Sequence, residues 1–581
     1  MGMITIASHI YGWMLRLTCI MAVVVASLSI PVEVKCAESG TAADKLSPET
    51  GISSFRYASF GLGLYPYRRT VPNAQVRVRI DGVPLRSVSP FGSDLTLVPG
   101  GLVDSVTRSG DGGLDIATVD PAGEKTVTSI DFSQGTHRRF TFDSLYRRPI
   151  GESGGILFGG SASGIHSTED TMKSSYRSYY LKYTGGLSIG GNAFFTSHGS
   201  RNRSGLADLD MLDDMGERKT DRFAVSLGLD EVPVGAHGNL GTSLYWQSMN
   251  SRFARYGWRR SLDDDGAGVS VQFASKMGRA SYGVRLYHDA VFFDSRIHDD
   301  AWTRTVTGGD GTVSLSWGSI SFALDGGAAT SSKYGFGSHM GGKLSHRRSD
   351  RDELYLSVGV SEEFPDTGGE YYTSLAFSDT ALVAVLDAYT VREAEIGLKA
   401  GKGPFGLSVA GFVSSSEAPV FRPSSVSLDY RVYAPYTTEF IMDGEREWRG
   451  LRCSAETAFE SFVTVDASVD GVWRDGANES DMSWPWPDYD VGGVLNIRDR
   501  WYRDLIGMHA FTECNLYHFD DAGTDPGGAF LLLDCGLSIN VSDIELFYVI
   551  ENVTNEDIAW FNTFGWLDMN GRWGVSWRFI D

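Results

Sequence analysis

Hydrophobic and polar residues alternate along most of the chain beyond residue 125. Large apolar side chains stand at every second position in several stretches, among them 223–229, 313–317, 354–360, 544–550 and 573–579. Successive side chains of a β-strand point to opposite faces, so each stretch predicts a strand with one apolar and one small or polar face. The pattern therefore predicts an all-β fold.

The apolar faces of these strands can pack against one another or face lipid. Lipid is favoured by the aromatic residues on them, which include Trp573, Trp577, Tyr179 and Tyr183, because aromatic girdles mark the membrane interfaces of β-barrels. The alternating region also extends over about 450 residues, more than one sandwich holds. At roughly 20 residues per strand and connection it predicts a large transmembrane antiparallel β-barrel of about 22 strands over residues 126–581.

The connections between the predicted strands are of two kinds. Short glycine-containing joins occur at 185–186, 277–279 and 401–403. Long polar segments occur at 200–218, 250–266 and 476–490. Outer-membrane barrels have short turns on the periplasmic rim and long loops outside the cell. We therefore expect the short joins on the periplasmic rim and the long polar segments on the outer rim.

The amino-terminal 36 residues have the features of a targeting signal. Arg16 precedes a mostly apolar run over 17–30, which is shorter than the approximately 20 residues that span a bilayer. We predict a signal peptide over 1–36, with cleavage after Cys36, and an anchoring helix remains the alternative. Residues 37–50 are polar and predict a disordered segment.

Composition limits the partners. The chain has 73 acidic and 51 basic residues and a net charge of −22, which argues against binding to nucleic-acid phosphates. Glycine (69 residues) and aromatic residues (12%) suit strands, tight turns and interfacial rings. Export and a lipid-facing barrel together predict the outer membrane of a Gram-negative bacterium, with outer-membrane lipid as a partner.

Residues 51–125 differ from the barrel and predict a small separate domain. A strand over 76–80 runs into Asp81, Gly82, Val83 and Pro84, whose residue types favour a turn. The stretch 94–99 follows, and another short strand is expected at 103–106.

Several motifs resemble TonB-dependent outer-membrane receptors. The run VRVRIDGVPL (76–85), followed by DLTLVPGGLVDSV (94–106), is similar to the later half of the plug domain of that family. The stretches 390–415, 547–560 and 570–579 resemble a barrel hairpin and the terminal segments of the family. The resemblance covers about 70–581 and implies a plug inside the barrel lumen, with Ile80, Asp81, Gly82, Val83 and Pro84 as its structural motif.

The resemblance also implies partners and a function. The last strand, with Trp573, Val575, Trp577 and Phe579, would be the signal for the barrel assembly machinery. The receptor would take up a scarce nutrient such as a metal chelate, cobalamin or an oligosaccharide, with TonB as an energy-coupling partner. The nutrient itself is not identified by the sequence.

The chain departs from the family pattern at its amino-terminal side. The plug has about 75 residues instead of 130 or more, as if its first half were missing. No TonB box is recognisable over 38–50, and 110–114 is at most a remnant of the usual glycine-rich stretch. Two alternatives therefore stay open: a passive channel or surface binding protein without TonB coupling, and a soluble exported β-protein such as a propeller lectin.

Catalytic chemistry and resident cofactors are not indicated by any motif. Acidic groups at Asp208–Asp214 and at Asp263, Asp264 and Asp265 are expected in solvated loops, with Ca²⁺ binding as the weaker alternative. His298, Asp299 and Asp300 form a weak candidate metal corner. We therefore predict neither an enzyme nor a metalloprotein.

Three cysteines remain after the predicted signal peptide. Cys514 and Cys535 flank a loop at 523–525 and would face each other across a hairpin, so a disulfide and two free thiols are both open. Cys453 stands apart in the sequence.

Two further groups of residues have a structural and a functional interpretation. The stretch Trp484–Pro487 with Tyr489 predicts an interfacial turn, or alternatively a ligand-stacking surface. Lys182, Glu395, Lys399 and Arg578 stand on polar strand faces and are expected to line the lumen.

Overall fold

The computed structural model describes most of the chain beyond residue 51. The described residues are 42, 46, 52–56, 64–72, 74–86, 93–109, 112–122, 125–151, 153–166, 173–205, 217–255, 258–295, 300–349, 351–365, 388–418, 420–423, 438–441, 445–460, 463–476, 487–501, 506–519, 528–556, 559–560, 564–565 and 569–580. The predicted signal peptide and most of 37–50 lie outside them. None of the helices in this described part is both long and apolar enough to cross a membrane.

The main body is a closed antiparallel β-barrel of 22 strands, which confirms the predicted fold class and strand number. Its first half consists of β7 (Val127–Gly135), β8 (Phe140–Ile150), β9 (Gly154–His166), β10 (Lys173–Gly186), β11 (Asn192–Gly205), β12 (Glu217–Val234), β13 (Gly238–Arg255), β14 (Trp258–Met277), β15 (Ala280–Ser295), β16 (Asp300–Trp317) and β17 (Ile320–Ser331). Its second half consists of β18 (Gly335–Arg347), β19 (Glu353–Glu363), β20 (Tyr389–Lys402), β21 (Phe405–Ser416), β24 (Arg446–Glu460), β25 (Val463–Gly476), β26 (Tyr489–Trp501), β27 (Ile506–Phe519), β28 (Gly528–Val541), β29 (Ile544–Glu551) and β32 (Asn570–Ile580).

The ring closes between the first and last barrel strands. β32 pairs antiparallel with β7 from Arg572 opposite Gly135 to Ile580 opposite Val127. Phe132 and Trp573 meet edge to face across this seam, with ring centroids 6.4 Å apart. Each of the 22 barrel strands therefore has two neighbours, and the barrel sheet has no open edge.

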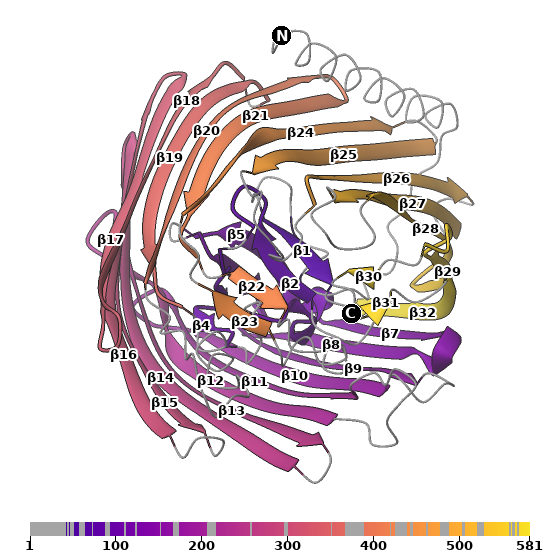
Figure 1. The fold of residues 1–581 in the computed structure, drawn as a ribbon, viewed down its shortest axis with the longest axis horizontal. Coiled ribbons are helices and arrows are strands. Elements are labelled where there is room, and N and C mark those ends of the chain that lie inside the picture. The colour runs from indigo at the N-terminus through magenta and orange to yellow at the C-terminus, as the bar shows by residue number, and fades with distance from the viewer. Residues whose placement is uncertain are drawn as a thin grey trace.

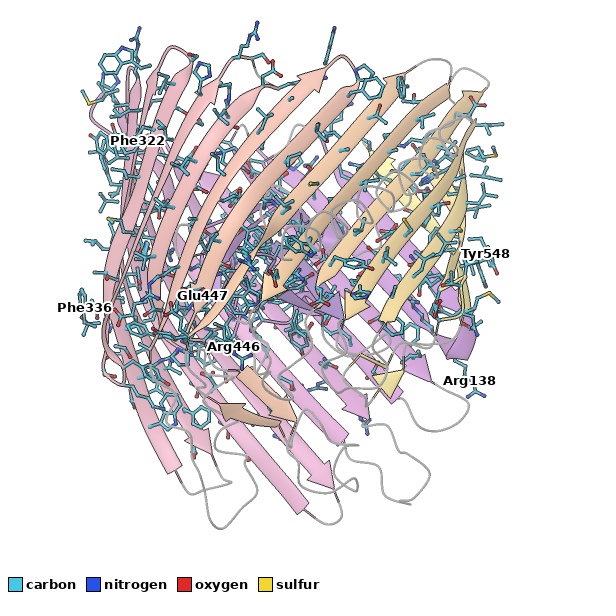
Figure 2. All side chains as sticks on the ribbon, turned by 45° about the horizontal axis from the view of Figure 1, so that its top comes forward. Arg138, Phe322, Phe336, Arg446, Glu447 and Tyr548 are labelled. Carbon is cyan, nitrogen blue, oxygen red and sulfur yellow. The ribbon has the colours of Figure 1, made fainter. Side chains whose placement is uncertain are left out.

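The apolar faces of the strands point outward. On β19, Leu354, Leu356, Val358 and Val360 are 40–53% exposed, whereas Tyr355 between them is buried. Trp573 and Trp577 on β32 are likewise exposed on the outer surface. Figure 2 shows Phe322, Phe336 and Tyr548 on the outer surface of the wall. An apolar outer band of this kind is the surface that a barrel presents to lipid.

The two rims differ in the length of their connections, as the sequence predicts. On one rim Met277 of β14 is followed by β15 at Ala280, and Lys402 of β20 by β21 at Phe405. Gly278 and Gly403 have φ of 60° and 59° in these turns, a conformation that glycine adopts without strain. On the other rim β19 ends at Glu363 and β20 begins only at Tyr389.

Residues 52–118 form small sheets within the ring (Figure 1). One is the hairpin of β1 (Ile52–Arg56) and β2 (Leu64–Arg68). The other has the order β4-β3-β6-β5, with β3 (Val78–Ile80), β4 (Val83–Pro84), β5 (Val103–Arg108) and β6 (Leu114–Thr118). Two 3₁₀ turns, η3 (Leu95–Leu97) and η4 (Gly100–Leu102), lie between β4 and β5, and η5 (Thr136–Arg138) joins β7 to β8. We refer to residues 52–118 as the plug.

The plug has its own small core. Val78, Ile80, Leu95, Leu114 and Ile116 are buried together, and Leu157 of the barrel wall packs with them. The plug is thus a folded unit whose apolar side is completed by the inner face of the barrel.

Two further pairs of short strands lie outside the barrel sheet. They are β22 (Val420–Pro423) with β23 (Thr438–Ile441), and β30 (Ala559–Trp560) with β31 (Phe564–Gly565). Figure 1 shows both pairs within the outline of the ring.

One sequence expectation needs correction, and of the two alternatives left open for Cys514 and Cys535 the free thiols are the one found. The segment 250–266 is mostly strand, because β13 continues to Arg255 and β14 begins at Trp258, so Asp263, Asp264 and Asp265 are wall residues and not loop residues. The hairpin of β27 and β28 is present, but Cys514 and Cys535 are free thiols. The register explains this, because Cys514 stands opposite Leu533 and Cys535 stands opposite Thr512.

Candidate functional site: the interface between plug and barrel

The turn after β3 joins the plug to one sector of the wall. Asp81 and Gly82 have φ of 46° and 83°, which reverses the chain so that Val83 pairs back with Ile80. The Asp81 carboxylate accepts a hydrogen bond from the backbone N–H of Thr118 at 2.9 Å and forms an ion pair with Lys182 of β10 at 3.2 Å. The predicted motif is therefore also a docking contact, and Lys182 does face the lumen.

The charge of Asp81 is maintained by these partners. Burial alone would raise the pKa of this carboxyl group, but the Lys182 ammonium and the hydrogen bonds from Thr118 hold its pKa below the ordinary value. Tyr180 of β10 donates a further hydrogen bond to the same carboxylate. Asp81 therefore stays ionised at neutral pH despite its position between plug and wall.

A second sector of contact lies at β19 and β20. Arg68 of the plug forms a buried ion pair with Glu363 at 2.7 Å, and Tyr389 donates a hydrogen bond to the other oxygen of that carboxylate at 3.3 Å. Arg108 forms an ion pair with Glu393 at 2.6 Å. Two plug arginines thus meet two carboxylates on adjacent wall strands.

A third sector lies at β25 and β26. The guanidinium of Arg69 contacts Asp470 and lies 3.6 Å from Asp490, which also forms an ion pair with Arg474 of the wall. Arg474 donates a hydrogen bond from Nε to the backbone oxygen of Arg69 at 2.7 Å. Tyr67 donates to Asp490 at 3.4 Å, and burial followed by the Asp490 charge raises the pKa of Tyr67 to about 12.

A fourth sector lies at β14. Arg86 donates to the Asp264 carboxylate at 2.8 Å, and the two side chains are 7% and 0% exposed. Nearby, Arg222 of β12 donates to the backbone oxygen of Pro84 at 3.0 Å. Asp264 therefore belongs to a plug contact and not to the solvated acidic loop that the sequence suggested.

Taken together, these contacts attach the plug to four separated sectors of the wall. Each sector has at least one pair of a charged plug residue with an oppositely charged residue of an inward strand face. Buried pairs of this kind are strongly destabilised when one partner alone is removed. Charge pairing therefore holds the plug in the lumen together with the apolar contact between the plug core and Leu157 of the wall.

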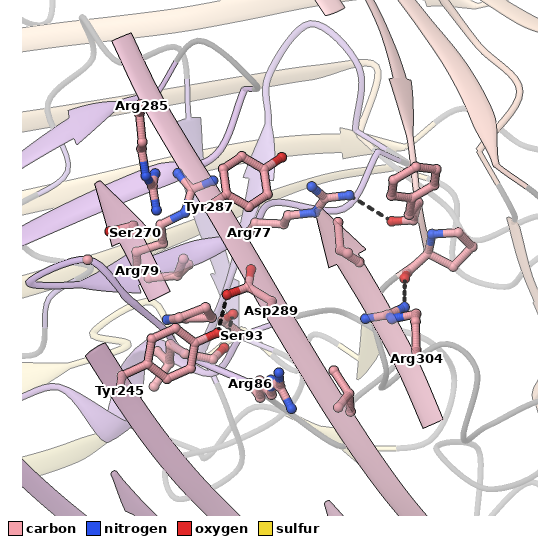
Figure 3. Close-up of a pocket in the computed structure, with 18 residues that line it drawn as sticks. Arg77, Arg79, Arg86, Ser93, Tyr245, Ser270, Arg285, Tyr287, Asp289 and Arg304 are labelled. Atoms are coloured by element: carbon pink, nitrogen blue, oxygen red, sulfur yellow. Dashed lines mark hydrogen bonds between the residues drawn. The ribbon is translucent and has the colours of Figure 1, made fainter. Parts of the chain in front are cut away.

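Between plug and wall lies a cavity of about 120 Å³, which we call the arginine cavity. Its lining includes Arg77, Arg79 and Arg86 of the plug and Arg285 and Arg304 of the wall (Figure 3). Asp289 of β15 also lines it and accepts a hydrogen bond from Tyr245 at 2.6 Å.

Two of these arginines hold the chain that leaves β19. Arg77 donates to the backbone oxygen of Phe364 and Arg304 to that of Pro365, both at 2.9 Å (Figure 3). The Phe364 ring is buried and stacks on Tyr334 with centroids 6.0 Å apart. One side of the arginine cavity is therefore formed by the segment that begins the connection from β19 to β20.

A second cavity of about 420 Å³ adjoins the first, and we call it the acidic cavity. Arg79 and Arg285 line both cavities. Its carboxylates are those of Asp115, Asp230, Glu231, Asp310 and Asp325. The two cavities thus differ in sign, with Arg79 and Arg285 at their junction.

The remaining predicted site residues have separate positions. Glu395 faces the lumen and forms an ion pair with Arg452 at 2.8 Å, while Lys399 stands opposite Glu353 in the register and Arg578 opposite Ser129. Tyr489 stacks on His518 with centroids 4.6 Å apart. Residues 208–214, 298–299 and 484–486 lie outside the described part. Among the described residues, no group of three or more His, Cys, Asp or Glu side chains is arranged to hold a metal ion.

Sequence reasoning missed the arginine cavity. Arg77, just before β3, and Arg79 within it alternate with Val78 and Ile80, so the two arginines point to the same side of this extended segment. That alternation was a usable signal for a cationic face of the plug. The wall contribution of Arg285, more than 200 residues further along, had no comparable signal.

Comparison with known proteins places the fold. No family model matches the chain, and no curated protein matches its sequence. Solved structures do match. The FrpB iron transporter from Neisseria meningitidis (F3-3 variant) is similar with a TM-score of 0.72 and 11% identity, over 94% of this chain and 99% of the other.

Two further solved structures are similar to this chain over most of its length. The siderophore receptor PirA from Pseudomonas aeruginosa has a TM-score of 0.65 and 11% identity, over 88% of this chain and 92% of its own. The copper transporter OprC has a TM-score of 0.69 and 12% identity, over 91% and 94%. The chain therefore has the plug-and-barrel fold of the TonB-dependent receptors of the Gram-negative outer membrane.

Proposed function

We propose that this protein is an outer-membrane receptor that imports a scarce small solute through its barrel. The observation that carries the proposal is the charge-paired plug inside a closed ring, because a lumen filled in this way suits controlled passage. A metal chelate is the favoured solute, since the similar structures are described as transporters or receptors for iron, siderophores and copper. Cobalamin and oligosaccharides are the remaining classes.

In this proposal the plug must move for the solute to pass. The solute is captured on the rim with long connections, and the ion pairs of Arg68, Arg69 and Arg86 then have to open on at least one side. Several buried pairs breaking together need an energy source, which favours coupling to TonB. The stretch over 38–50, in which no TonB box is recognisable, leaves the coupling segment unidentified.

Conductance in planar bilayers tests the closed state. The purified protein should conduct little, and a variant without residues 52–118 should form a large constitutive pore. A large conductance of the intact protein would replace the receptor proposal by the passive channel.

An uptake experiment tests which class of solute the protein imports and whether import needs TonB. Cells that depend on this protein are supplied with one ferric or cupric chelate, cobalamin or an oligosaccharide as the limiting nutrient, with and without functional TonB. Growth on a chelate only when both proteins are present supports the proposal. Equal uptake with and without TonB contradicts energised transport, and uptake of none of these nutrients contradicts the receptor function.

A further inference from the structure

A group of cations lies on the outward face of the wall, near the rim with the long connections. The side chains come from four neighbouring strands, β10 to β13, and we call them the cation belt: Arg177, Arg201, Arg203, Lys219 and Arg252. The four arginines are exposed, and Lys219 is 33% exposed. On the same side of these strands Tyr179, Leu227 and Trp246 are 43–55% exposed, so the belt belongs to the outer surface of the barrel.

The strand register places the cations of the belt beside one another. Arg177 stands opposite Arg201. Two residues nearer the rim, Lys219 stands between Arg203 and Arg252. Directly opposed side chains on adjacent strands have Cβ atoms about 5 Å apart, and like charges at this spacing destabilise a sheet. The wall therefore has three like-charged neighbouring pairs within a small area.

Part of this charge is compensated within the wall. Asp221 of β12 forms ion pairs with Arg201 and with Lys219, the latter at 3.3 Å. In the described part of the chain no carboxylate pairs with Arg177. One carboxylate is thus shared by two of the cations, and the belt retains an excess of positive charge.

The belt ends where the wall becomes acidic. Arg252 donates a hydrogen bond from Nε to the side-chain oxygen of Asn250 at 2.9 Å, and it forms no ion pair with a described residue. Asn250 in turn donates to Asp263 of the next strand, β14. The positive excess is therefore confined to β10–β13, although the chain as a whole has a net charge of −22.

The belt borders the apolar band of the barrel. On β12 the outward residues over 223–229 are all apolar, and the next two outward positions toward the rim are Asp221 and Lys219. On β10 Tyr179 is the outward residue next to Arg177. Aromatic side chains mark the boundary between the hydrocarbon core and the headgroups of a membrane. The belt therefore lies at the level of the lipid headgroups.

We infer that the cation belt binds the phosphate groups of a lipid in the outer leaflet of the membrane. Guanidinium groups bind phosphate through two parallel hydrogen bonds, and a phosphate between Arg177 and Arg201 compensates their repulsion. The rim with the long connections faces the outside of the cell, which assigns the lipid to the outer leaflet. Its acyl chains then lie along the apolar band. This inference goes beyond the proposed function, because it does not depend on the imported solute.

Lipid binding to the purified full-length protein in detergent tests the inference. Diphosphoryl lipid A, a glycolipid with two phosphate groups, is the probe, and the same lipid without phosphates is the neutral control. Native mass spectrometry measures the fraction of protein that retains each lipid. We expect the diphosphoryl form to be retained, less so at high salt, and the neutral form to be lost. Equal retention of both lipids overturns the inference, and so does saturable binding of inorganic phosphate without retention of lipid A.

Substitutions assign the binding to the belt. The double variant Arg177→Gln with Arg252→Gln should bind diphosphoryl lipid A about thirtyfold more weakly, because two cations that face the headgroups are removed. The corresponding double lysine variant keeps both charges and should lie between this variant and the wild type. Arg449→Gln is the matched control. Arg449 is exposed on the outward face of β24 near the same rim, and Asp475 compensates its charge.

The opposite change gives a second, independent readout. Asp221→Asn removes the carboxylate that Arg201 and Lys219 share, so it should strengthen the binding of diphosphoryl lipid A. Partial unfolding does not produce a gain in affinity, so this variant keeps the test decisive if the double glutamine variant is unstable. Unchanged or lower affinity of Asp221→Asn contradicts the inference. Equal affinities of the double glutamine variant and Arg449→Gln contradict it as well.

Discussion

Arg86 of the plug and Asp264 of the barrel wall form an ion pair of 2.8 Å, although 178 residues separate them in the chain. The Asp264 side chain is completely buried, so its pair with the plug is shielded from solvent. Removing one member of a buried pair leaves the other without compensation, which costs about 3–5 kcal/mol. The docking of the plug should therefore respond strongly to single substitutions at this pair.

We predict that Arg86→Ala weakens plug docking by about 3–5 kcal/mol. Protease cleavage of the plug and bilayer conductance measure the loss. The double variant Arg86→Met with Asp264→Leu should regain most of the docking, because it removes both charges. The exposed pair of Arg201 with Asp221 is the control, and Arg201→Ala should cost no more than about 1 kcal/mol. Equal effects of Arg86→Ala and Arg201→Ala would contradict the prediction.

The stabilisation that the contact of Asp81 with Lys182 provides should depend on pH. The folded-state pKa of Asp81 lies below its unfolded value of about 4, so its stabilisation is fully present above pH 4. The stabilisation is lost as the pH falls through the lower folded-state value. Thermal unfolding of the wild type and Asp81→Asn from pH 7 to pH 2.5 should show a constant difference above about pH 4 that shrinks below it. Parallel curves over the whole range would exclude this role.

The cysteine register predicts a selective cross-link. Cys535 stands opposite Thr512, whose hydroxyl oxygen lies 3.7 Å from its sulfur, whereas Cys514 is displaced along the strand by two residues. Thr512→Cys should therefore form a disulfide with Cys535 under mild oxidation, while the wild type retains its thiols. Intact mass and peptide mapping distinguish the two results. A native link between Cys514 and Cys535 in the folded protein would contradict the register.

The orientation of the strand faces is tested on β19. Val358 is 53% exposed on the outer surface, and Ser357 is on the opposite face. Val358→Arg should destabilise the barrel in lipid by up to about 4 kcal/mol, and Ser357→Arg by much less. Urea unfolding in lipid vesicles compares the two variants. A larger loss of stability from Ser357→Arg than from Val358→Arg would contradict the assignment of Val358 to the lipid face.

The fold was accessible from sequence because its main signal is local. The alternation around Leu354 and Trp573 is sufficient to predict strands and, by its length, their approximate number. The limits of β13 and β14 were missed because strands that continue beyond the membrane lose the apolar face, and the three aspartates at 263–265 then resemble a loop.

The site was accessible only in part, because its contacts join distant segments. Arg68 and Glu363 are 295 residues apart, and nothing in either local sequence indicates the other. The turn at Asp81 was recognised by residue type, but its partner Lys182 was placed only as a lumen residue. Long-range charge pairing depends on the register of the whole ring, which one sequence does not specify.

The seam between β7 and β32 has a consequence for the order of assembly. The plug precedes every wall strand in the chain, and the last strand supplies the final pairing. Because the ring shuts only when its carboxyl-terminal strand pairs with β7, the plug can be in place before the ring closes. We therefore expect the wall to enclose the plug during folding, so that the plug does not have to enter through a finished opening.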